Sequence, residues 1–167
     1  SIIEASSFEA SFTTRDLLLY ALGVGATVGD QSALEGEGEG EGERYLLDEG
    51  HPGFAALPTY YLALVFKGAG GGVVPFPPAH FPVVPRGWDL AGRQLIHLDQ
   101  SLEVFIPPSP QGGTLYVTAH IEAAWPVRRG TAVRARCTLR NGREGAVAAV
   151  ATMTTLVRGL AAPPPPP

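Results

Sequence analysis

The sequence has very little sulfur, with one cysteine and one methionine in 167 residues. Cys137 has no partner for an internal disulfide, so the sequence shows no sign of an oxidising compartment. This cysteine lies in an apolar alternation, and we interpret it as a small buried hydrophobic residue rather than a reactive thiol. No apolar run reaches the roughly 18 residues of a membrane span, so we expect no membrane partner.

Metal and nucleic-acid motifs are also missing. The four histidines share no metal-ligand spacing, and a single cysteine cannot build a zinc cluster. The sequence has neither a basic stripe interleaved with aromatic residues nor a recognised nucleic-acid module, which argues against nucleic acid as a partner. We therefore expect no metal and no cofactor.

Charge is distributed unevenly along the chain. In residues 1–49, eleven acidic residues against two arginines give −9, whereas ten basic against five acidic residues give +5 in the remainder. Eight arginines lie between Arg86 and Arg143. Such asymmetry fits an anionic partner, which could be a phosphate group, nucleic acid or an acidic protein surface, while a solvated strand face is the simpler explanation.

The length and the 45% apolar content predict one domain, which we place at residues 1–160. Within it, the Glu/Gly-rich stretch 31–44 predicts a loop insertion, because like charges repel and glycine is costly to order. Five prolines in residues 73–87 predict an irregular surface excursion. Residues 161–167 are a proline-rich tail or linker, for which polyproline II is the expected conformation.

Two helices are predicted. Thr13 as N-cap, with Asp16 three residues later, predicts a capping box. The apolar face of this helix comprises Leu17, Tyr20, Ala21 and Val24, and Gly23 or Gly25 can adopt the left-handed conformation at its end. The second helix follows Pro58; residues 60–66 are apolar on every side, which predicts a buried helix that ends at Gly68.

The C-terminal half predicts an antiparallel sheet. Alternation over residues 101–106, 115–125 and 133–140 predicts three strands, with one buried face that runs from Leu115 through Ile121 to Trp125. Asn141-Gly142 is a strong hairpin signal. The returning strand, 146–157, is apolar on both faces and should lie centrally. We expect a partner to cover Ala149, Ala151 and Met153, because a bare apolar face is an aggregation hazard.

Four landmarks, which together extend from Ser11 to Gly159, carry a family resemblance. They are the opening run Phe12–Ala26; the segments Tyr45–Glu49 and Phe54–Tyr60; the segment Ile96–Glu103; and Thr152–Gly159. In this order they resemble hydratase 2 proteins, the MaoC-like enoyl-CoA hydratases. The resemblance implies an α+β hotdog fold, in which an antiparallel sheet wraps around a central buried helix. It also implies a strand at Tyr45–Glu49, a double-hotdog arrangement and a peroxisomal or mitochondrial location, although no targeting signal is readable.

The resemblance is to the N-terminal half of these proteins, whereas the family's catalytic motif, Gly-Asp-x-Asn-Pro-x-His, lies in the C-terminal half. This sequence has no Asn-Pro pair, and its only Gly-Asp pair, Gly29-Asp30, continues as Gln31-Ser32. The resemblance therefore implies that the chain has no catalytic residues, and the sequence leaves open whether it is an enzyme.

The resemblance also implies substrate-binding residues. In related enzymes an overhanging segment covers the acyl chain, so Phe76, Phe81 and Trp88 are candidates for lining a hydrophobic tunnel. Alternatively, these aromatic side chains attach the proline-rich segment to the rest of the domain. His97 matches a family histidine and is weighed between a structural role and substrate contact. The full candidate set is Leu57, Pro58, Thr59, Phe76, Phe81, Trp88, His97 and Gln100.

Three functions remain open. The first is the acyl-accommodating, non-catalytic N-terminal half of a (3R)-hydroxyacyl-CoA dehydratase, or 2-enoyl-CoA hydratase 2, of fatty acid metabolism. The second is a repurposed hotdog that serves as a structural or accessory subunit of a larger assembly. The third is an acyl-CoA binding module without turnover. The expected partner is a second hotdog half or another copy of the chain, and acyl-CoA is a candidate ligand.

Overall fold

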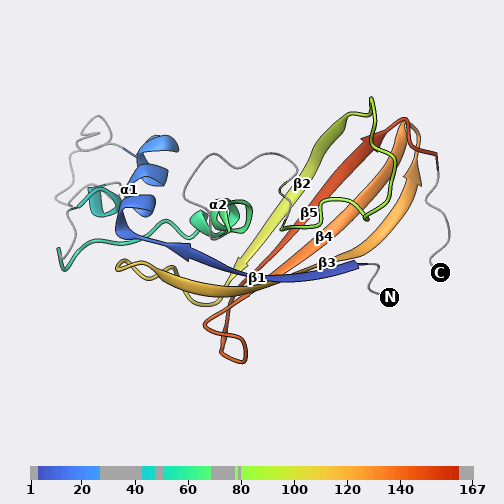
Figure 1. Ribbon diagram of the computed structural model, residues 1–167. Helices are drawn as coiled ribbons and strands as arrows, with labels where there is room; N and C mark the ends of the chain where they lie inside the picture. The colour runs from blue at the N-terminus through green and yellow to red at the C-terminus, as the bar shows by residue number, and fades with distance from the viewer. Residues whose placement is uncertain (1–3, 27–42, 48–50, 69–77, 79, 162–167) are drawn as a thin grey trace.

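The computed structural model describes residues 4–26, 43–47, 51–68, 78 and 80–161 (Figure 1). Within these residues, no helix is long and apolar enough to cross a membrane. The elements are, in chain order, strand β1 (Glu4–Phe12), helix α1 (Thr14–Gly23), 3-10 helix η1 (Glu43–Tyr45), helix α2 (Tyr60–Lys67), and strands β2 (Leu95–Val104), β3 (Gly113–Val127), β4 (Gly130–Arg140) and β5 (Val147–Arg158).

The strands form one antiparallel sheet in the order β1-β3-β4-β5-β2, as predicted for the C-terminal half. The sheet curves around α2 (Figure 1). In the central strands Cys137 is paired with Ala151 and Ala135 with Met153, and all four side chains are buried on the inner face. β1 and β2 form the two edges, and β5 lies between β4 and β2, which confirms its central position.

Helix α1 begins with the predicted capping box. The Thr13 hydroxyl accepts a hydrogen bond from the Asp16 backbone, and the Asp16 carboxylate accepts one from the Thr13 backbone. Gly25, just after the C-cap, has φ of +93°, a conformation that favours glycine. Leu17 is buried, but Val24 is 57% exposed because the helix ends before it and Val24 serves as the C-cap.

Helix α2 is the predicted buried helix. Tyr61 and Leu64 are almost fully buried, and Gly68 ends the helix at φ +59°. Residues 80–94, which we call the covering segment, lie on the same side of the sheet (Figure 1). The inner face of the sheet is thus covered by α2 at one end and by the covering segment at the other, where Trp88 packs against Ile121, Val133 and Val157.

The prediction that a partner covers Ala149, Ala151 and Met153 is wrong. The chain itself buries all three, to 5% exposure or less, in the core beneath α2. The alternate residues of β5 include Thr152 and Thr154, so the outer face of this strand is less apolar than the inner one.

Other expectations differ in detail. The described part of the segment Tyr45–Glu49 contains the end of η1 rather than a strand, and Arg44 stacks over Tyr45 there. The strand predicted at 101–106 begins at Leu95 and ends at Val104. A bulge between Ile121 and Ala123 shifts the register of β3, so Trp125 lies with Arg134 on the outer face. Residues 31–42, 73–77, 79 and 162–167 of the predicted loop, excursion and tail lie outside the described residues.

Candidate ligand-binding site

Two cavities lie on the inner side of the sheet. The first, which we call the α2 cavity, lies between α2 and strands β4 and β5 and has a volume of about 10 Å³. A cavity needs about 10–15 Å³ to hold one water molecule, so this space is almost filled by its own lining. Its lining is apolar except for Gln100 and Thr152 and otherwise comprises Leu62, Val65, Phe66, Phe81, Ala135, Cys137, Ala151 and Met153.

The second cavity, which we call the loop cavity, has a volume of about 210 Å³. Its wall is formed mostly by the covering segment, which is built of turns such as Pro85–Trp88. The prolines of this segment lack N–H donors. Ser6 contributes from β1, and the remaining lining residues are Pro78, His80, Phe81, Pro82, Val83, Val84, Pro85, Arg86, Gly87, Trp88 and Leu90.

His80 anchors the covering segment. Its Nε2 lies 3.1 Å from the carbonyl oxygen of Val65 in α2, and its own carbonyl accepts a hydrogen bond from the Ser6 hydroxyl at 3.1 Å. Because a carbonyl can only accept, Nε2 must carry the proton in this contact. The ring also lies edge-on to Phe8, with centroids 4.6 Å apart. His80 thus ties the start of the covering segment to both α2 and β1.

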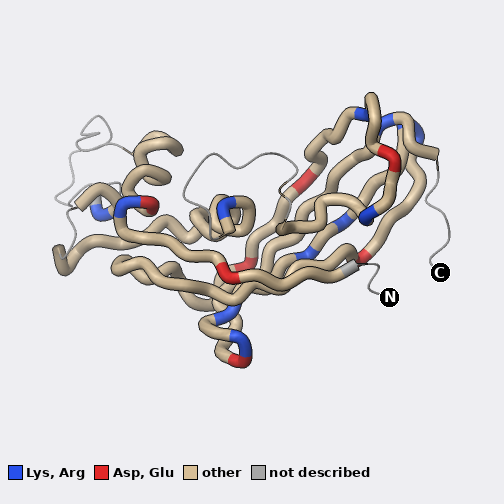
Figure 2. Tube along the Cα trace, viewed as in Figure 1, with Lys and Arg blue, Asp and Glu red and all other residues tan. Residues whose placement is uncertain are grey.

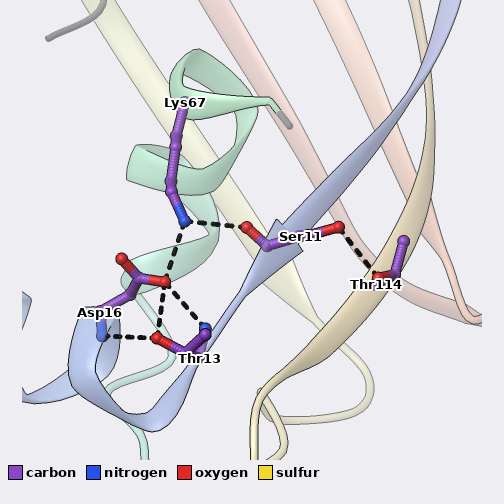
Figure 3. A network of polar contacts seen from close by, with 5 residues as sticks. All are labelled: Ser11, Thr13, Asp16, Lys67 and Thr114. Carbon is purple, nitrogen blue, oxygen red and sulfur yellow. Dashed lines mark hydrogen bonds and ion pairs between the residues drawn. The ribbon is translucent and has the colours of Figure 1, made fainter. Parts of the chain in front are cut away.

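A polar network fixes the other side of α2 (Figure 3). The ammonium group of Lys67 donates to the Asp16 carboxylate and to the Ser11 carbonyl, each at 2.9 Å. Asp16 also accepts hydrogen bonds from the Thr13 backbone and hydroxyl. Across β1 and β3, the hydroxyls of Ser11 and Thr114 lie 2.9 Å apart. This network joins α1, α2, β1 and β3.

The network also determines the ionisation of Asp16. Partial burial acts to raise the pKa of this carboxyl group, but hydrogen bonds from Lys67 and Thr13, together with the positive charge of Lys67, outweigh that effect. The pKa of Asp16 therefore lies below its ordinary value of 3.8. Asp16 is ionised at neutral pH and acts as a structural anion.

Two neighbouring tyrosines of α2 differ in their hydrogen bonding. The Tyr61 hydroxyl donates to the carbonyl of Ile106 at 2.9 Å, and burial raises the pKa of Tyr61 to about 12. The Tyr60 hydroxyl is buried and has no hydrogen-bond partner among the described residues. Burial, and secondarily the charge of Asp16, raises the pKa of Tyr60 as well. Both phenols are neutral at physiological pH.

Chemically reactive groups are scarce around both cavities. Cys137 is 3% exposed, and burial raises its thiol pKa, so the thiolate nucleophile is disfavoured. No carboxylate in the described part of the chain lines either cavity. In that same part, no group of three His, Cys, Asp or Glu residues could hold a metal ion. The described lining of the two cavities thus offers mostly apolar side chains and no carboxylate that could act as a general acid or base.

The structure brings some of the predicted site residues together. Phe81 and Gln100 line the α2 cavity, and Phe81 and Trp88 line the loop cavity. Leu57, Pro58 and Thr59 lie just before α2, where their carbonyls accept hydrogen bonds from its first turn, and they line neither cavity. His97 is exposed on β2, opposite Thr155, and also lines neither. Phe76 lies outside the described residues.

The arginines of β4 lie away from the cavities, on the outer face of the sheet. Arg134 stacks over Trp125 at 5.4 Å, and Arg136 lies 3.5 Å from the Glu122 carboxylate. Figure 2 shows basic residues along the sheet. Arg128 and Arg129 lie between β3 and β4 and are exposed. Arg134 and Arg136 thus contact other side chains of the outer face and line neither cavity.

An antiparallel sheet curved around a central helix is the hotdog fold, and this chain has it. The family model for the MFE-2 hydratase 2 N-terminal domain matches residues 10–159. The chain belongs to that family. No match was found among the curated proteins.

Solved structures share the fold. A MaoC-like dehydratase from Phytophthora capsici is 29% identical with a TM-score of 0.72, over 94% of this chain and 48% of that one. The chain thus spans about half the length of that protein. The ChsH1-ChsH2 complex from Mycobacterium tuberculosis is 17% identical with a TM-score of 0.60, over 97% of this chain and 88% of that one. The HadBC (3R-hydroxyacyl-ACP dehydratase) complex of the same organism is 15% identical with a TM-score of 0.52, over 93% and 98%.

Proposed function

We propose that this chain is the acyl-accommodating, non-catalytic N-terminal half of a 2-enoyl-CoA hydratase 2, an enzyme that in the reverse direction is a (3R)-hydroxyacyl-CoA dehydratase. The observation that carries the proposal is the loop cavity, a space of about 210 Å³ walled mostly by apolar residues, with no carboxylate among its described lining residues. Its wall combines apolar side chains such as Phe81 and Trp88 with the polar side chains of Ser6, His80 and Arg86. A mostly apolar lining with a few polar groups is typical of a site that binds a small molecule.

In this proposal Phe81 and Trp88 contact the acyl chain. Both belong to the loop cavity lining, and their rings are held by the fold: Phe81 against Phe66 of α2, and Trp88 against the inner face of the sheet. Typical small-molecule pockets have volumes of about 300–1,000 Å³, so the loop cavity suits the apolar end of a thioester rather than a whole acyl-CoA. The roles of Leu57, Pro58, Thr59 and His97 in binding stay predictions.

Hydration of an enoyl thioester requires a base to activate water and an acid to protonate the substrate. Around the cavities the titratable side chains are Cys137, His80 and Arg86. Burial keeps Cys137 protonated, and the His80 Nε2 is engaged by the Val65 carbonyl. The missing Gly-Asp-x-Asn-Pro-x-His motif agrees with this, and a second hotdog is proposed to supply the chemistry.

The second hotdog is proposed to lie at the edge strand β2. In the described sheet, β2 pairs on one side only, with β5, and its neighbouring side chains include exposed large hydrophobics. These are Ile96, Leu98, Phe105 and Ile106, four of the eight large hydrophobic residues exposed in the described part of the chain. An edge strand with unpaired backbone groups and exposed apolar side chains tends to associate with another chain. The similar solved structures from M. tuberculosis are of complexes, which supports a hotdog partner.

The test measures binding and turnover separately. The purified chain should bind a saturated acyl-CoA in calorimetry and should not hydrate trans-2-enoyl-CoA. Trp88→Ala should weaken binding, whereas Trp125→Ala, the matched change on the outer face, should leave it unchanged. Hydration by the chain alone, abolished by His97→Ala, would overturn the non-catalytic assignment. Absence of acyl-CoA binding would instead favour an accessory subunit of a larger assembly.

A further inference from the structure

Phe81 has a position that no other described residue shares: it lines both the α2 cavity and the loop cavity. Its side chain is 4% exposed. Phe81 therefore borders both spaces, with the nearly filled cavity beneath α2 on one side and the larger cavity, walled mostly by the covering segment itself, on the other.

The ring is also held in place from several directions. It packs edge-on against Phe66 of α2, with ring centroids 5.6 Å apart and planes at 80°. The preceding residue, His80, is tied to Val65 and Ser6, as described above. Pro82 follows directly, and a residue before proline is restricted to extended backbone conformations. These constraints make the Phe81 ring a fixed wall rather than a mobile flap.

The space behind this wall is suited to an alkyl chain but is closed to it. The α2 cavity is bounded by Leu62, Val65 and Met153 and has only about 10 Å³ of free volume while the Phe81 ring is present. Removing the ring would vacate the volume that it fills and would join the two cavities into one apolar channel that extends under α2.

We propose that Phe81 is the residue that sets the length of the acyl chain the protein accepts, by closing the inner end of the loop cavity. This inference rests on the proposed acyl-binding function and adds the residue that limits its substrate range. Chains short enough to end at the ring are bound along their whole apolar length, and longer chains cannot continue toward α2.

The test is the dependence of affinity on chain length. For the full chain and for Phe81→Ala, dissociation constants are measured by calorimetry for saturated acyl-CoA thioesters from butyryl to palmitoyl. Burial of each methylene should tighten binding about fourfold until the cavity is full. In the wild type this gain should stop at a defined chain length, and in Phe81→Ala it should continue to a longer one.

Phe54→Ala is the matched control, because Phe54 is a buried phenylalanine of the same core that lines neither cavity. It should leave the chain-length limit unchanged. If Phe81→Ala does not fold, Phe81→Leu removes the ring while keeping an apolar side chain and should shift the limit in the same direction. If a folded Phe81 variant binds short acyl chains normally and has the same chain-length limit as the wild type, Phe81 does not set that limit. The proposed acyl-binding function would still stand. Loss of all acyl-CoA binding in the wild type would overturn the proposed function and this inference with it.

Discussion

Replacing Asp16 by alanine should destabilise the fold by removing one acceptor that serves three donors. The Oδ2 atom accepts from the Thr13 backbone at 2.8 Å, from the Thr13 hydroxyl at 3.0 Å and from Lys67 at 2.9 Å. Two of these contacts begin α1, and the third connects α1 to α2. The Thr13 hydroxyl would still accept a hydrogen bond from the backbone N–H of residue 16, so the variant should lose the carboxylate half of the capping box and the ion pair. Lys67 would keep its hydrogen bond to the Ser11 carbonyl.

The expected loss is about 1–2 kcal/mol of unfolding free energy. Losing the hydrogen bonds that Thr13 donates to the Asp16 carboxylate costs about 0.5–1.5 kcal/mol. The Asp16 and Lys67 side chains remain 28% and 23% exposed, so water screens their ion pair. Such a pair adds about 0–1 kcal/mol. In a domain of this size, a loss of about 1–2 kcal/mol lowers the melting temperature by about 2–8 °C.

The loss of unfolding free energy can be measured by urea unfolding. The proteins compared are the wild type, Asp16→Ala, Lys67→Met and the variant with both substitutions. The double-mutant cycle isolates the ion pair, and its coupling should not exceed about 1 kcal/mol, because both side chains are partly exposed to water. The variant Arg15→Ala, one residue away and exposed, is the control and should be nearly neutral. A loss below about 0.5 kcal/mol for Asp16→Ala, which is less than the contribution of one hydrogen bond, would refute the reasoning.

The lowered pKa of Asp16 adds a pH dependence to the same prediction. A carboxyl group whose pKa is lower when folded stabilises the protein above its unfolded pKa, here 3.8, and loses that contribution as the pH falls through its folded value. The stability difference between wild type and Asp16→Asn should therefore be constant near neutral pH and shrink below about pH 4. A difference that grows on acidification would contradict the assignment of Asp16 as the anion.

Two further predictions concern the buried tyrosines and the sheet edge. Tyr61→Phe should lower the free energy of unfolding by about 1 kcal/mol, because it removes the 2.9 Å hydrogen bond to the Ile106 carbonyl. Tyr60→Phe should be neutral or stabilising, because the Tyr60 hydroxyl has no hydrogen-bond partner among the described residues. Equal losses in urea unfolding would contradict this contrast. Light scattering should show the isolated chain as a dimer or larger species, and Ile96→Lys with Leu98→Lys should favour the monomer; a wild-type monomer at high concentration would contradict association through β2.

The start of α1 and the burial of α2 were predictable because their signals are local. Thr13 and Asp16 are three residues apart, so their capping box is visible in the sequence and is confirmed. Apolar residues on all sides of α2 likewise indicate burial wherever the helix lies. The contact of Asp16 with Lys67 joins residues 51 positions apart, and no local pattern predicts such a partner.

The candidate site was less predictable for the same reason. His80 carries no signal in its proline-rich surroundings, yet it binds α2, and its carbonyl pairs with Ser6, 74 residues away. Alternation predicted β3 well as far as Ile121. It failed at Trp125 because a bulge adds a residue to one strand and so moves every later side chain to the opposite face.

The error about β5 also changes where a partner is expected. Apolar residues on both faces of a strand suggested a partner against its face, but α2 and the covering segment bury the inner face, and Thr152 and Thr154 make the outer face more polar. The open backbone lies instead at β2, one strand further out. A partner at an edge adds backbone hydrogen bonds as well as side-chain contacts, and it extends the sheet while leaving the inner face for a ligand. Association through β2 and occupation of the loop cavity by an acyl chain are therefore compatible, because the sheet residue that lines this cavity, Ser6, lies on β1, at the opposite edge of the sheet from β2.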